Sequence, residues 1–419
     1  MVVRKGYKQT EIGIVPNDWD IRNILENSTL KGRIGWQGLT TVEYRESGKF
    51  YLVTGKDFEN GKINWNTCVY VDKKRFDQDK NIQLNIGDVL VTKDGTIGKI
   101  AYVHSLPLPA TLNTGVFVIR SKNNQYLSLF LYYLLTSNYF KNFLAKLTAG
   151  STITHLYQKD FANFSFVIPD IDEQEKIIRS LSDIDELIEK LDYLIKKKKN
   201  IKQGTMQELL TGKRRLEGFG GDWKTVEIGN RIDLLTGFPF PSNQYSINGI
   251  RLLRGSNIKR GYTDWSEDIT EYWEAITPNL RKYLLNEGDI VVAMDGSLVG
   301  KSFARISQND LPALLLQRVA RIRSTSINMD YLKEWICSEF FTKYCDSIKT
   351  ASAIPHISPD DIKKFSISIP DSKEEQFRIA KILSDMDCEI EALEKQRDKY
   401  INLKQGMMQK LLTGEIRLV

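Results

Sequence analysis

One stretch of the chain has the residue types of a phosphate-binding loop. Asp295 to Ser302 reads DGSLVGKS, and such a loop ends in G-K-S or G-K-T. The loop requires G-x-x-x-x-G-K-[ST], because its glycine backbone cradles the phosphates, and Asp295 stands where the first glycine must be. A second copy of the stretch, DGTIGKI, is shorter and lacks the serine. The residues therefore predict a turn between strands rather than a nucleotide site.

Other catalytic patterns are incomplete or missing from the sequence. Asp361 and Lys363 imitate the end of a nuclease D-x-K pattern, but the second copy, at Asp160, has alanine in place of the lysine, so we interpret the pair as solvated charge. The sequence contains no N-P-P-Y or D-P-P-Y string, no H-E-x-x-H pair and no nucleophile elbow. Its three histidines offer little material for acid–base catalysis. We therefore expect a non-catalytic chain with no cofactor and no metal, whose chemistry lies in partner proteins.

The elements that would position these residues occur twice. Segments about 200 residues apart match in order along nearly the whole chain, which indicates a tandem duplication. A short D-W stretch opens each copy, at Trp19 and at Trp223. Further along, YLVTGKDFENGKINW matches RLLRGSNIKRGYTDW, and GDVLVTKDGTIGK matches GDIVVAMDGSLVGK.

Each copy begins with a region that predicts strands and hairpins. Its apolar runs are short, rich in Val, Ile, Tyr and Phe, and interrupted by Gly, Asn and Asp. The G-D and D-G pairs on either side of VLVTK are turn signals that flank a strand. One helix is expected at roughly 125–146, with an equivalent in the second copy.

A long helical pattern then follows in each copy. Apolar residues recur at alternating steps of four and three, which is the seam of a coiled coil. The seam residues are Ile177, Leu181, Ile184, Ile188 and Leu191 in the first copy and Ile379, Leu383, Met386, Ile390 and Leu393 in the second. We expect them to form a core first and a partner-docking surface second. The two helices would most simply pair antiparallel, each about 60 Å long at 1.5 Å per residue.

These patterns predict an α+β protein with an internal pseudo-two-fold axis. Two mixed α/β domains are joined by two long antiparallel coiled-coil helices. The expected boundaries are 1–168 and 213–369 for the two domains, and 169–212 and 370–419 for the helices.

Composition narrows the class of protein further. The formal net charge of +6 arises from 59 basic and 53 acidic residues, which permits nucleic-acid binding without requiring it. The four cysteines form no C-x-x-C pair, which argues against a disulfide framework and against a zinc ribbon. The same cysteine pattern favours a reducing, cytoplasmic setting. No apolar run is long enough for a membrane span, so we expect no membrane partner.

The repeated segments resemble the specificity subunits of Type I restriction-modification systems. The segments that carry the resemblance are IPDIDEQEKI and IPDSKEEQFRI at the helix starts, and MQELLTGKRRL and MQKLLTGEIRL at the helix ends. The first segment is one residue shorter than the second between its proline and its glutamine. The resemblance implies that each domain is a target-recognition domain for one half of a split, asymmetric site on double-stranded DNA. It also implies two methyltransferase subunits docked on the helices, and motor-nuclease subunits that join them.

Candidate DNA contacts follow from residue chemistry within that resemblance. Small polar loops, basic residues near the D-G turns and the LRGSNIKRG cluster could approach phosphates or base edges. The candidates are Lys56, Lys93, Lys99, Gly150, Ser151, Thr152, Thr154 and His155 in the first copy, and Arg254, Asn257, Lys259, Arg260, Lys301, Ser352 and His356 in the second. Surface solvation is the alternative for each lysine taken singly, and a simple connecting loop is the alternative for each histidine-bearing segment.

Two further alternatives stay open at this level. The run Lys196–Lys199 could touch DNA or a partner, but a solvated helix face is favoured. The whole chain could instead be a coiled-coil scaffold whose two domains bind protein rather than DNA.

Overall fold

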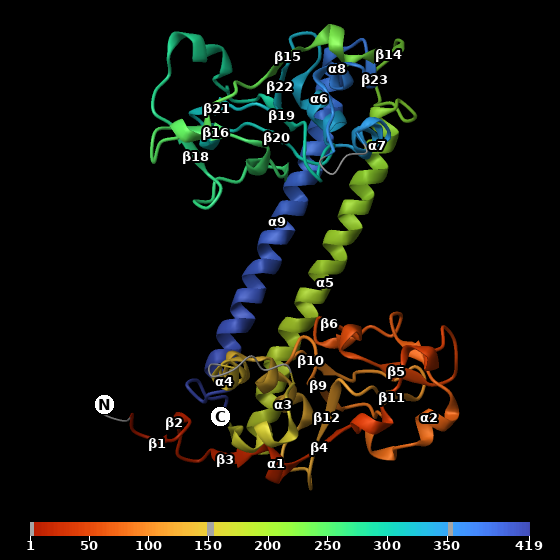
Figure 1. Cartoon of the computed structure of the whole chain (residues 1–419), viewed down its shortest axis with the longest axis vertical. Helices are drawn as coiled ribbons and strands as arrows, with labels where there is room; N and C mark the ends of the chain where they lie inside the picture. The colour runs from red at the N-terminus through yellow and green to blue at the C-terminus, as the bar shows by residue number, and fades with distance from the viewer. Residues whose placement is uncertain (1–3, 149–154, 351–354) are drawn as a thin grey trace. The chain divides into compact units, whose positions relative to one another are not determined.

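A computed structural model describes residues 4–148, 155–350 and 355–419 of the chain. The chain divides into two compact units (Figure 1). Unit 1 comprises Met1–Asp192 and Lys395–Val419, and unit 2 comprises Tyr193–Glu394. Two long helices, α5 (Ile171–Leu210) and α9 (Lys373–Leu411), each contribute one part to either unit. The expected fold class, with two mixed domains and two long helices, is confirmed.

Unit 1 is built around a four-stranded and a three-stranded sheet. The first has the order β10 (Ile100–Tyr102), β9 (Val89–Thr92), β12 (Val116–Ser121), β4 (Ser28–Gly32), and the second the order β11 (Ala110–Leu112), β5 (Tyr51–Val53), β8 (Val69–Tyr70). Strands β5 and β11 are parallel, so the loops that follow them leave the same edge of their sheet. Residues from both sheets pack one apolar core, which includes Val53, Leu90 and Leu112.

Unit 2 repeats this architecture. Its larger sheet has the order β15 (Asp233–Thr236), β22 (Val319–Arg323), β19 (Ile290–Ala293), β20 (Phe303–Arg305), β17 (Arg260–Gly261), and its smaller sheet the order β18 (Glu271–Trp273), β16 (Ile250–Leu253), β21 (Ala313–Leu315). The pairing of β16 with β21 is parallel, as is that of β5 with β11. The duplication read from the sequence is therefore a duplication of strand topology.

Shorter elements complete the two units. The two-stranded pairs are β1 (Tyr7–Thr10) with β2 (Gly13–Pro16), β3 (Asp20–Asn23) with β13 (Ser165–Ile168), β6 (Phe58–Glu59) with β7 (Lys62–Ile63), and β14 (Trp223–Glu227) with β23 (Ser366–Pro370). The short helices are α1 (Ile24–Asn27), α2 (Lys73–Asp77) and α8 (Pro359–Lys363).

The single helix expected at 125–146 is wrong, because two helices occupy that region. They are α3 (Ser128–Thr136) and α4 (Asn138–Thr148), and unit 2 has α6 (Met329–Ile336) and α7 (Glu339–Ile348) in their place. Ser137 has an extended backbone, with ψ 168°, and its hydroxyl donates to the Leu134 carbonyl and accepts from the Tyr139 amide. The hydroxyl of Ser338 likewise caps α7 by accepting from the Phe341 amide. A serine that satisfies free helix-end groups on both sides permits the break.

The outer parts of the two long helices belong to the domain cores. Ile177 and Leu181 at the start of α5 are fully buried in the core of unit 1, together with Leu411 near the end of α9. Unit 2 buries Ile379 and Leu383 in the same way, together with Leu209 and Leu210. Of the other predicted seam residues, Leu191 and Ile390 are buried, and Ile184, Ile188, Met386 and Leu393 are half-buried.

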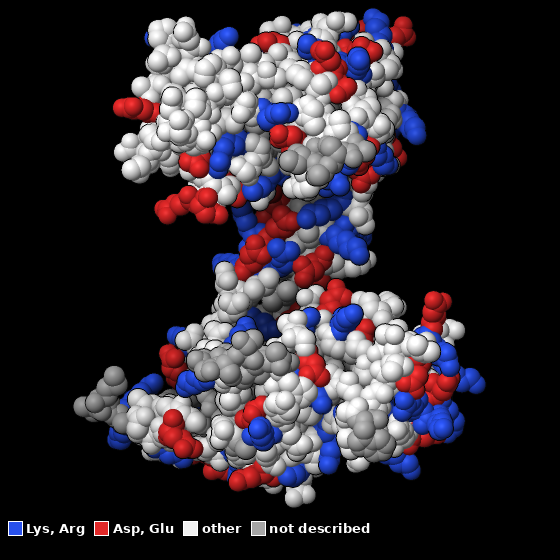
Figure 2. All heavy atoms as spheres, in the orientation of Figure 1, with Lys and Arg blue, Asp and Glu red and all other residues white. Residues whose placement is uncertain are grey.

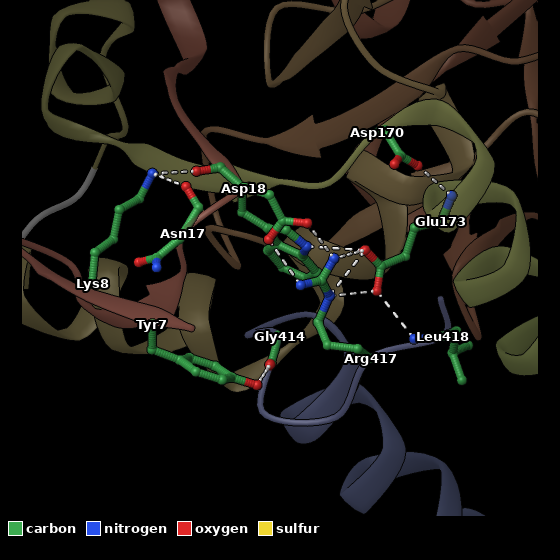
Figure 3. A network of polar contacts seen from close by, with 10 residues as sticks. Tyr7, Lys8, Asn17, Asp18, Asp170, Glu173, Gly414, Arg417 and Leu418 are labelled. Carbon is green, nitrogen blue, oxygen red and sulfur yellow. Dashed lines mark hydrogen bonds and ion pairs between the residues drawn. The ribbon is translucent and has the colours of Figure 1, made fainter. Parts of the chain in front are cut away.

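A buried glutamate at the start of α5 binds the tail that follows α9 within unit 1, and we call this contact the helix closure (Figure 3). The Glu173 carboxylate accepts two 2.8 Å hydrogen bonds from Arg417, one from the Leu418 amide at 3.1 Å and one from the Trp19 indole at 3.0 Å. Arg417 also donates to Asp18 at 2.9 and 2.8 Å. Burial pushes the pKa of Glu173 upward, but the hydrogen bonds from Arg417, Leu418 and Trp19 outweigh it and leave that pKa below its ordinary value.

Unit 2 has the same closure made by the equivalent residues. The Glu375 carboxylate is fully buried and accepts from Arg215 at 2.9 and 2.8 Å. Arg215 lies in the tail that follows α5, as Arg417 lies in the tail that follows α9. Each helix start is therefore tied to the tail of the other helix, which explains why the E-Q segment and the LLTG-x-x-R-L segment occur together in each copy.

The glutamine of the same segment anchors each long helix to its domain. Gln174 accepts from the Leu127 amide at 2.9 Å and donates to the Pro169 carbonyl at 3.0 Å. Gln376 makes the equivalent bonds to the Asn328 amide and the Pro370 carbonyl at the same two distances. The extra residue between proline and glutamine in the second copy therefore leaves this anchor unchanged.

Candidate nucleic-acid interface

Four loops converge at one end of the strands of unit 1. We call these loops the unit 1 strand-end loops, and they comprise residues 54–57, 93–99, 113–115 and 155–157. The Lys93 amide donates to the Gly115 carbonyl at 2.9 Å, and the Leu156 amide donates to the Lys93 carbonyl at 2.8 Å. At Gly55, an added Cβ would lie 2.7 Å from the Thr92 side chain, so the first loop packs directly on the end of β9. The structure thus brings together Lys56, Lys93, Lys99 and His155, which are far apart in the sequence.

The side chains on these loops differ in how free they are to meet a ligand. Lys56 and Lys99 are exposed. Lys93 is half-buried, with its ammonium 4.7 Å from the centre of the Phe117 ring, and burial lowers the pKa of Lys93. The His155 ring pairs with the Asp94 carboxylate and lies against Tyr157 with ring centres 4.4 Å apart. The two exposed lysines are therefore the best placed for phosphate contacts.

Unit 2 assembles the corresponding loops. The unit 2 strand-end loops comprise residues 254–257, 294–302, 316–318 and 355–357. The Met294 amide donates to the Arg318 carbonyl at 2.9 Å, and the Ile357 amide donates to the Met294 carbonyl at 2.9 Å. Lys301 is exposed within this group, as Lys99 is in unit 1. The segment that imitates a phosphate-binding loop is the turn between β19 and β20, as the sequence predicted.

The LRGSNIKRG cluster has a structural role at Asn257 that the sequence did not reveal. Asn257 is fully buried, accepts from the Arg254 amide at 3.1 Å and donates to the Asp264 carbonyl at 3.0 Å. Its equivalent in unit 1, Asp57, is also buried and caps the same turn by accepting from the Thr54 amide. The expectation that Asn257 reads a base is therefore corrected, since a fully buried amide holds the loop and is not accessible to DNA.

Among the described residues, the Arg254 and Lys259 side chains of this cluster donate hydrogen bonds to backbone carbonyls, and the Arg260 side chain donates none. The Arg254 guanidinium donates to the Ile269 carbonyl at 2.5 Å, and the Lys259 ammonium donates to the Ser256 carbonyl at 2.9 Å. Arg260 is exposed on β17. Arg254 and Lys259 would have to break or share these bonds to contact DNA, whereas Arg260 would not.

Several expected contacts fall outside the described residues. They are Gly150, Ser151, Thr152, Thr154 and Ser352. The described neighbours of these segments, His155 and His356, each form a β-bridge with the aspartate of the D-G turn, at Asp94 and Asp295. The predicted contacts by the five residues therefore stay predictions.

The structure also assigns roles to two charged groups outside these loops. Asp361 caps α8 by accepting from the Ser358 amide and hydroxyl, both at 2.7 Å, so it is a structural residue rather than solvated charge. In the lysine run, Lys198 and Lys199 each form a 2.6 Å ion pair with a glutamate of α9 within unit 2. The Lys198 and Lys199 side chains are still 31% and 55% exposed, so this half of the run is a solvated helix face that also carries ion pairs to α9.

Charges of both signs are mixed on the visible face of the molecule. On the face shown in Figure 2, lysine and arginine side chains lie among aspartate and glutamate side chains on both units. The modest net charge of +6 is consistent with this mixture. Long-range attraction to a polyanion is therefore modest, and local groups on the strand-end loops gain importance.

One exposed basic residue among the strand-end loops was not singled out from the sequence. Arg318 precedes β22 and lies among the unit 2 strand-end loops, where its side chain is 58% exposed. Its equivalent in the first copy is Gly115, so an alignment of the two copies could have shown that the position differs. Nothing in the sequence indicates the backbone conformation of Arg318, which has φ +69°.

Two further observations bear on membranes and metals. The helices of the described part of the chain include none that is both long and apolar enough to cross a membrane. Among residues 4–148, 155–350 and 355–419, no group of three or more His, Cys, Asp or Glu side chains could hold a metal ion.

Comparisons with known proteins agree on one family. The model of the Type I restriction modification DNA specificity domain matches twice, at residues 23–203 and 221–403. The chain is 28% identical over 353 residues to the Type I restriction enzyme MjaVIII specificity subunit of Methanocaldococcus jannaschii, covering 81% of either protein. It is 23% identical to the EcoKI specificity subunit of Escherichia coli K12, covering 96% of this chain and 90% of the relative.

A solved structure shows the same fold. The S subunit of a Type I restriction-modification system from M. genitalium matches with a TM-score of 0.59 and 15% identity, and the match covers 98% of both chains. The two matches to the domain model span most of the sequence and follow the duplication of strand topology and of helix closures. The chain therefore belongs to the Type I restriction-modification DNA specificity family, and it carries the family's domain twice.

Proposed function

We propose that this DNA specificity protein is the non-catalytic subunit that reads a split, asymmetric site for a Type I restriction-modification complex. One observation carries the proposal: both units gather equivalent loops at the same strand ends, on one topology, but with different side chains. Equivalent placement suits two half-sites on one duplex, and different side chains suit different base sequences. The proposed recognition domains are residues 1–168 and 213–369, with spacer helices at 169–212 and 370–419.

The partners follow from the same duplication. The same buried arrangement occurs at Glu173 and at Glu375, and from this duplication we infer that the chain has two nearly equivalent surfaces. Such a chain can bind two identical methyltransferase subunits, one for each copy, even though it is itself a single polypeptide. We propose that motor-nuclease subunits join this assembly and that it acts in the cytoplasm on double-stranded DNA.

Selection from a random duplex library tests the proposal. The chain is co-purified with its companion methyltransferase, bound duplexes are recovered at moderate salt, and the enriched sequences are read. We expect a pair of short, unlike motifs at constant separation. Recovery of the complex with no enriched motif would favour a protein-binding scaffold and contradict the proposal.

Phosphate contacts are tested separately by salt dependence. Lys99→Ala and Lys301→Ala each remove one exposed cation from the strand-end loops. Each is expected to weaken binding of all sequences alike and to reduce the slope of log affinity against log salt by about one. Lys343→Ala, which removes an exposed lysine on α7, serves as the control and should leave that slope unchanged. A slope unchanged in all three variants would remove the strand-end lysines from the interface.

A further inference from the structure

Arg318 has an unfavourable backbone conformation. Its φ of +69° lies in the left-handed region, which residues with a Cβ rarely adopt. Of the described residues other than glycine, those with positive φ are Asn60, Asn123, Asn124 and Arg318. Asparagine tolerates this region because its short amide can bond to the local backbone, but arginine has no such compensation. A strained residue retained on an exposed loop points to a function for its side chain.

The Arg318 side chain is held only weakly by its surroundings. Its side chain is 58% exposed, and its Nε lies 3.8 Å from the Asp295 carboxylate. Within the described residues, its guanidinium donates no hydrogen bond. By contrast, Arg323 at the other end of β22 donates to the buried Asp289 from both Nε and Nη2. Arg323 is a structural arginine, whereas Arg318 has donors free for a ligand.

The two units differ at this point although their backbones correspond. In unit 1 the position holds Gly115, and the aspartate of the turn, Asp94, pairs with His155. In unit 2 the equivalent Asp295 faces Arg318, and Nδ1 of His356 is buried with no hydrogen-bond partner in the described part of the chain. The same aspartate thus supports a different side chain in each unit, as expected where two domains read different sequences.

We propose that Arg318 is a specificity-determining residue that reads a guanine in the half-site bound by unit 2. The inference rests on the proposed function and deepens it. Guanine presents two acceptors, N7 and O6, in the major groove, and the arginine fork is the side chain that fits both. Because Asp295 lies on the Nε side, both Nη groups of Arg318 are available for this pair of acceptors. Asp295 acts as the positioning residue for the fork.

The test compares two substitutions in the complex with the methyltransferase, using selection from the random duplex library. Arg318→Gly is expected to lose preference for guanine at one position of one half-site by about tenfold or more, and to leave the other half-site unchanged. Thermal stability should be unchanged or higher, because glycine adopts positive φ without strain. Arg318→Lys should retain part of the affinity but lose the discrimination, since lysine lacks the fork. Arg281→Ala, which removes another exposed arginine of unit 2, is the control and should change neither half-site.

The outcomes separate this inference from the proposed function. If the wild-type chain selects two motifs and Arg318→Gly keeps the base preference at every position of both motifs, the inference is overturned and the proposed function stands. If Arg318→Gly weakens the binding of all DNA sequences equally, Arg318 contacts a phosphate and the inference is again overturned. If the wild-type chain selects no motif, the proposed function fails and the inference fails with it.

Discussion

The closure of unit 1 by Arg417 gives a stability prediction that can be worked from its contacts. Arg417→Ala removes the two guanidinium nitrogens that donate to the Glu173 carboxylate, which is 2% exposed, and the two that donate to the exposed Asp18. Loss of one partner from a buried ion pair typically costs about 3 to 5 kcal/mol, because the remaining charge stays buried. Glu173 keeps hydrogen bonds from Trp19 and the Leu418 amide in this variant. We therefore expect the free energy of unfolding to fall by about 2 to 3 kcal/mol, at or below the lower end of that range.

The assay is thermal unfolding of wild type and variant, together with hydrogen exchange, which shows whether the loss of stability lies in unit 1. For a unit of this size, about 2 to 3 kcal/mol corresponds to a decrease in Tm of roughly 4 to 12 °C. Arg214→Ala is the matched control, because Arg214 pairs with Glu208 at 3.1 Å where both side chains are more than half exposed. Such an exposed pair contributes about 0 to 1 kcal/mol. Equal effects of the two substitutions, or a change confined to unit 2, would refute the reasoning.

The same network fixes a pH dependence. Hydrogen bonding leaves the pKa of Glu173 in the folded chain below its ordinary value of 4.5. The ionised Glu173 carboxylate therefore contributes its full stabilisation above pH 4.5, and this stabilisation is lost as the pH falls through the lowered pKa. The difference in stability between wild type and Arg417→Ala should therefore be constant near neutral pH and narrow below about pH 4.5. A difference that widens on acidification would contradict this assignment.

Two further comparisons test the packing of unit 2. Lys202→Ala should lower the free energy of unfolding by about 1 to 3 kcal/mol, because Lys202 is only 15% exposed and pairs with Asp387. Lys199→Ala, at a lysine that is 55% exposed, should lower it by less than about 1 kcal/mol. Equal losses for the two variants in urea unfolding would argue against a buried pair at Lys202. Gly300→Ala should lower the free energy of unfolding by roughly 1 to 3 kcal/mol more than Gly261→Ala does. Both glycines have positive φ, but of the two only Gly300 would place its new Cβ against another atom, 2.5 Å from the Cβ of Cys345. Similar midpoints for the two variants would show that the site relaxes at little cost.

The organisation of the chain was predictable from its sequence because the pattern is repeated and long. Five matched segments in the same order define two copies, and the heptad steps at Ile177, Leu181, Ile379 and Leu383 identify helices with one buried face. The D-G turns were recognisable because glycine supplies the positive φ that such a turn requires, as at Gly95. These signals are local, so spacing alone reveals them.

The errors arose where tertiary contacts override a local pattern. Nothing in the apolar run at 125–146 marks Ser137 as a break, since its hydroxyl ends one helix and caps the next only in the folded chain. Asn257 has the chemistry of a base reader, but burial commits its amide to the Asp264 carbonyl. Arg318 was overlooked because the features that distinguish it are a backbone angle and a neighbour, Asp295, that is distant in sequence.

The placement of residues 395–419 in unit 1 has a consequence for how the chain folds during synthesis. Unit 2 is one continuous stretch, Tyr193–Glu394, so it can complete its core as soon as that stretch has left the ribosome. Unit 1 must wait, because Leu411 and Arg417 are made more than 200 residues after Ile177 and Glu173, which they cover. The first domain to be translated is therefore the second to be finished, and in the interval its apolar helix face remains open to chaperones or to aggregation.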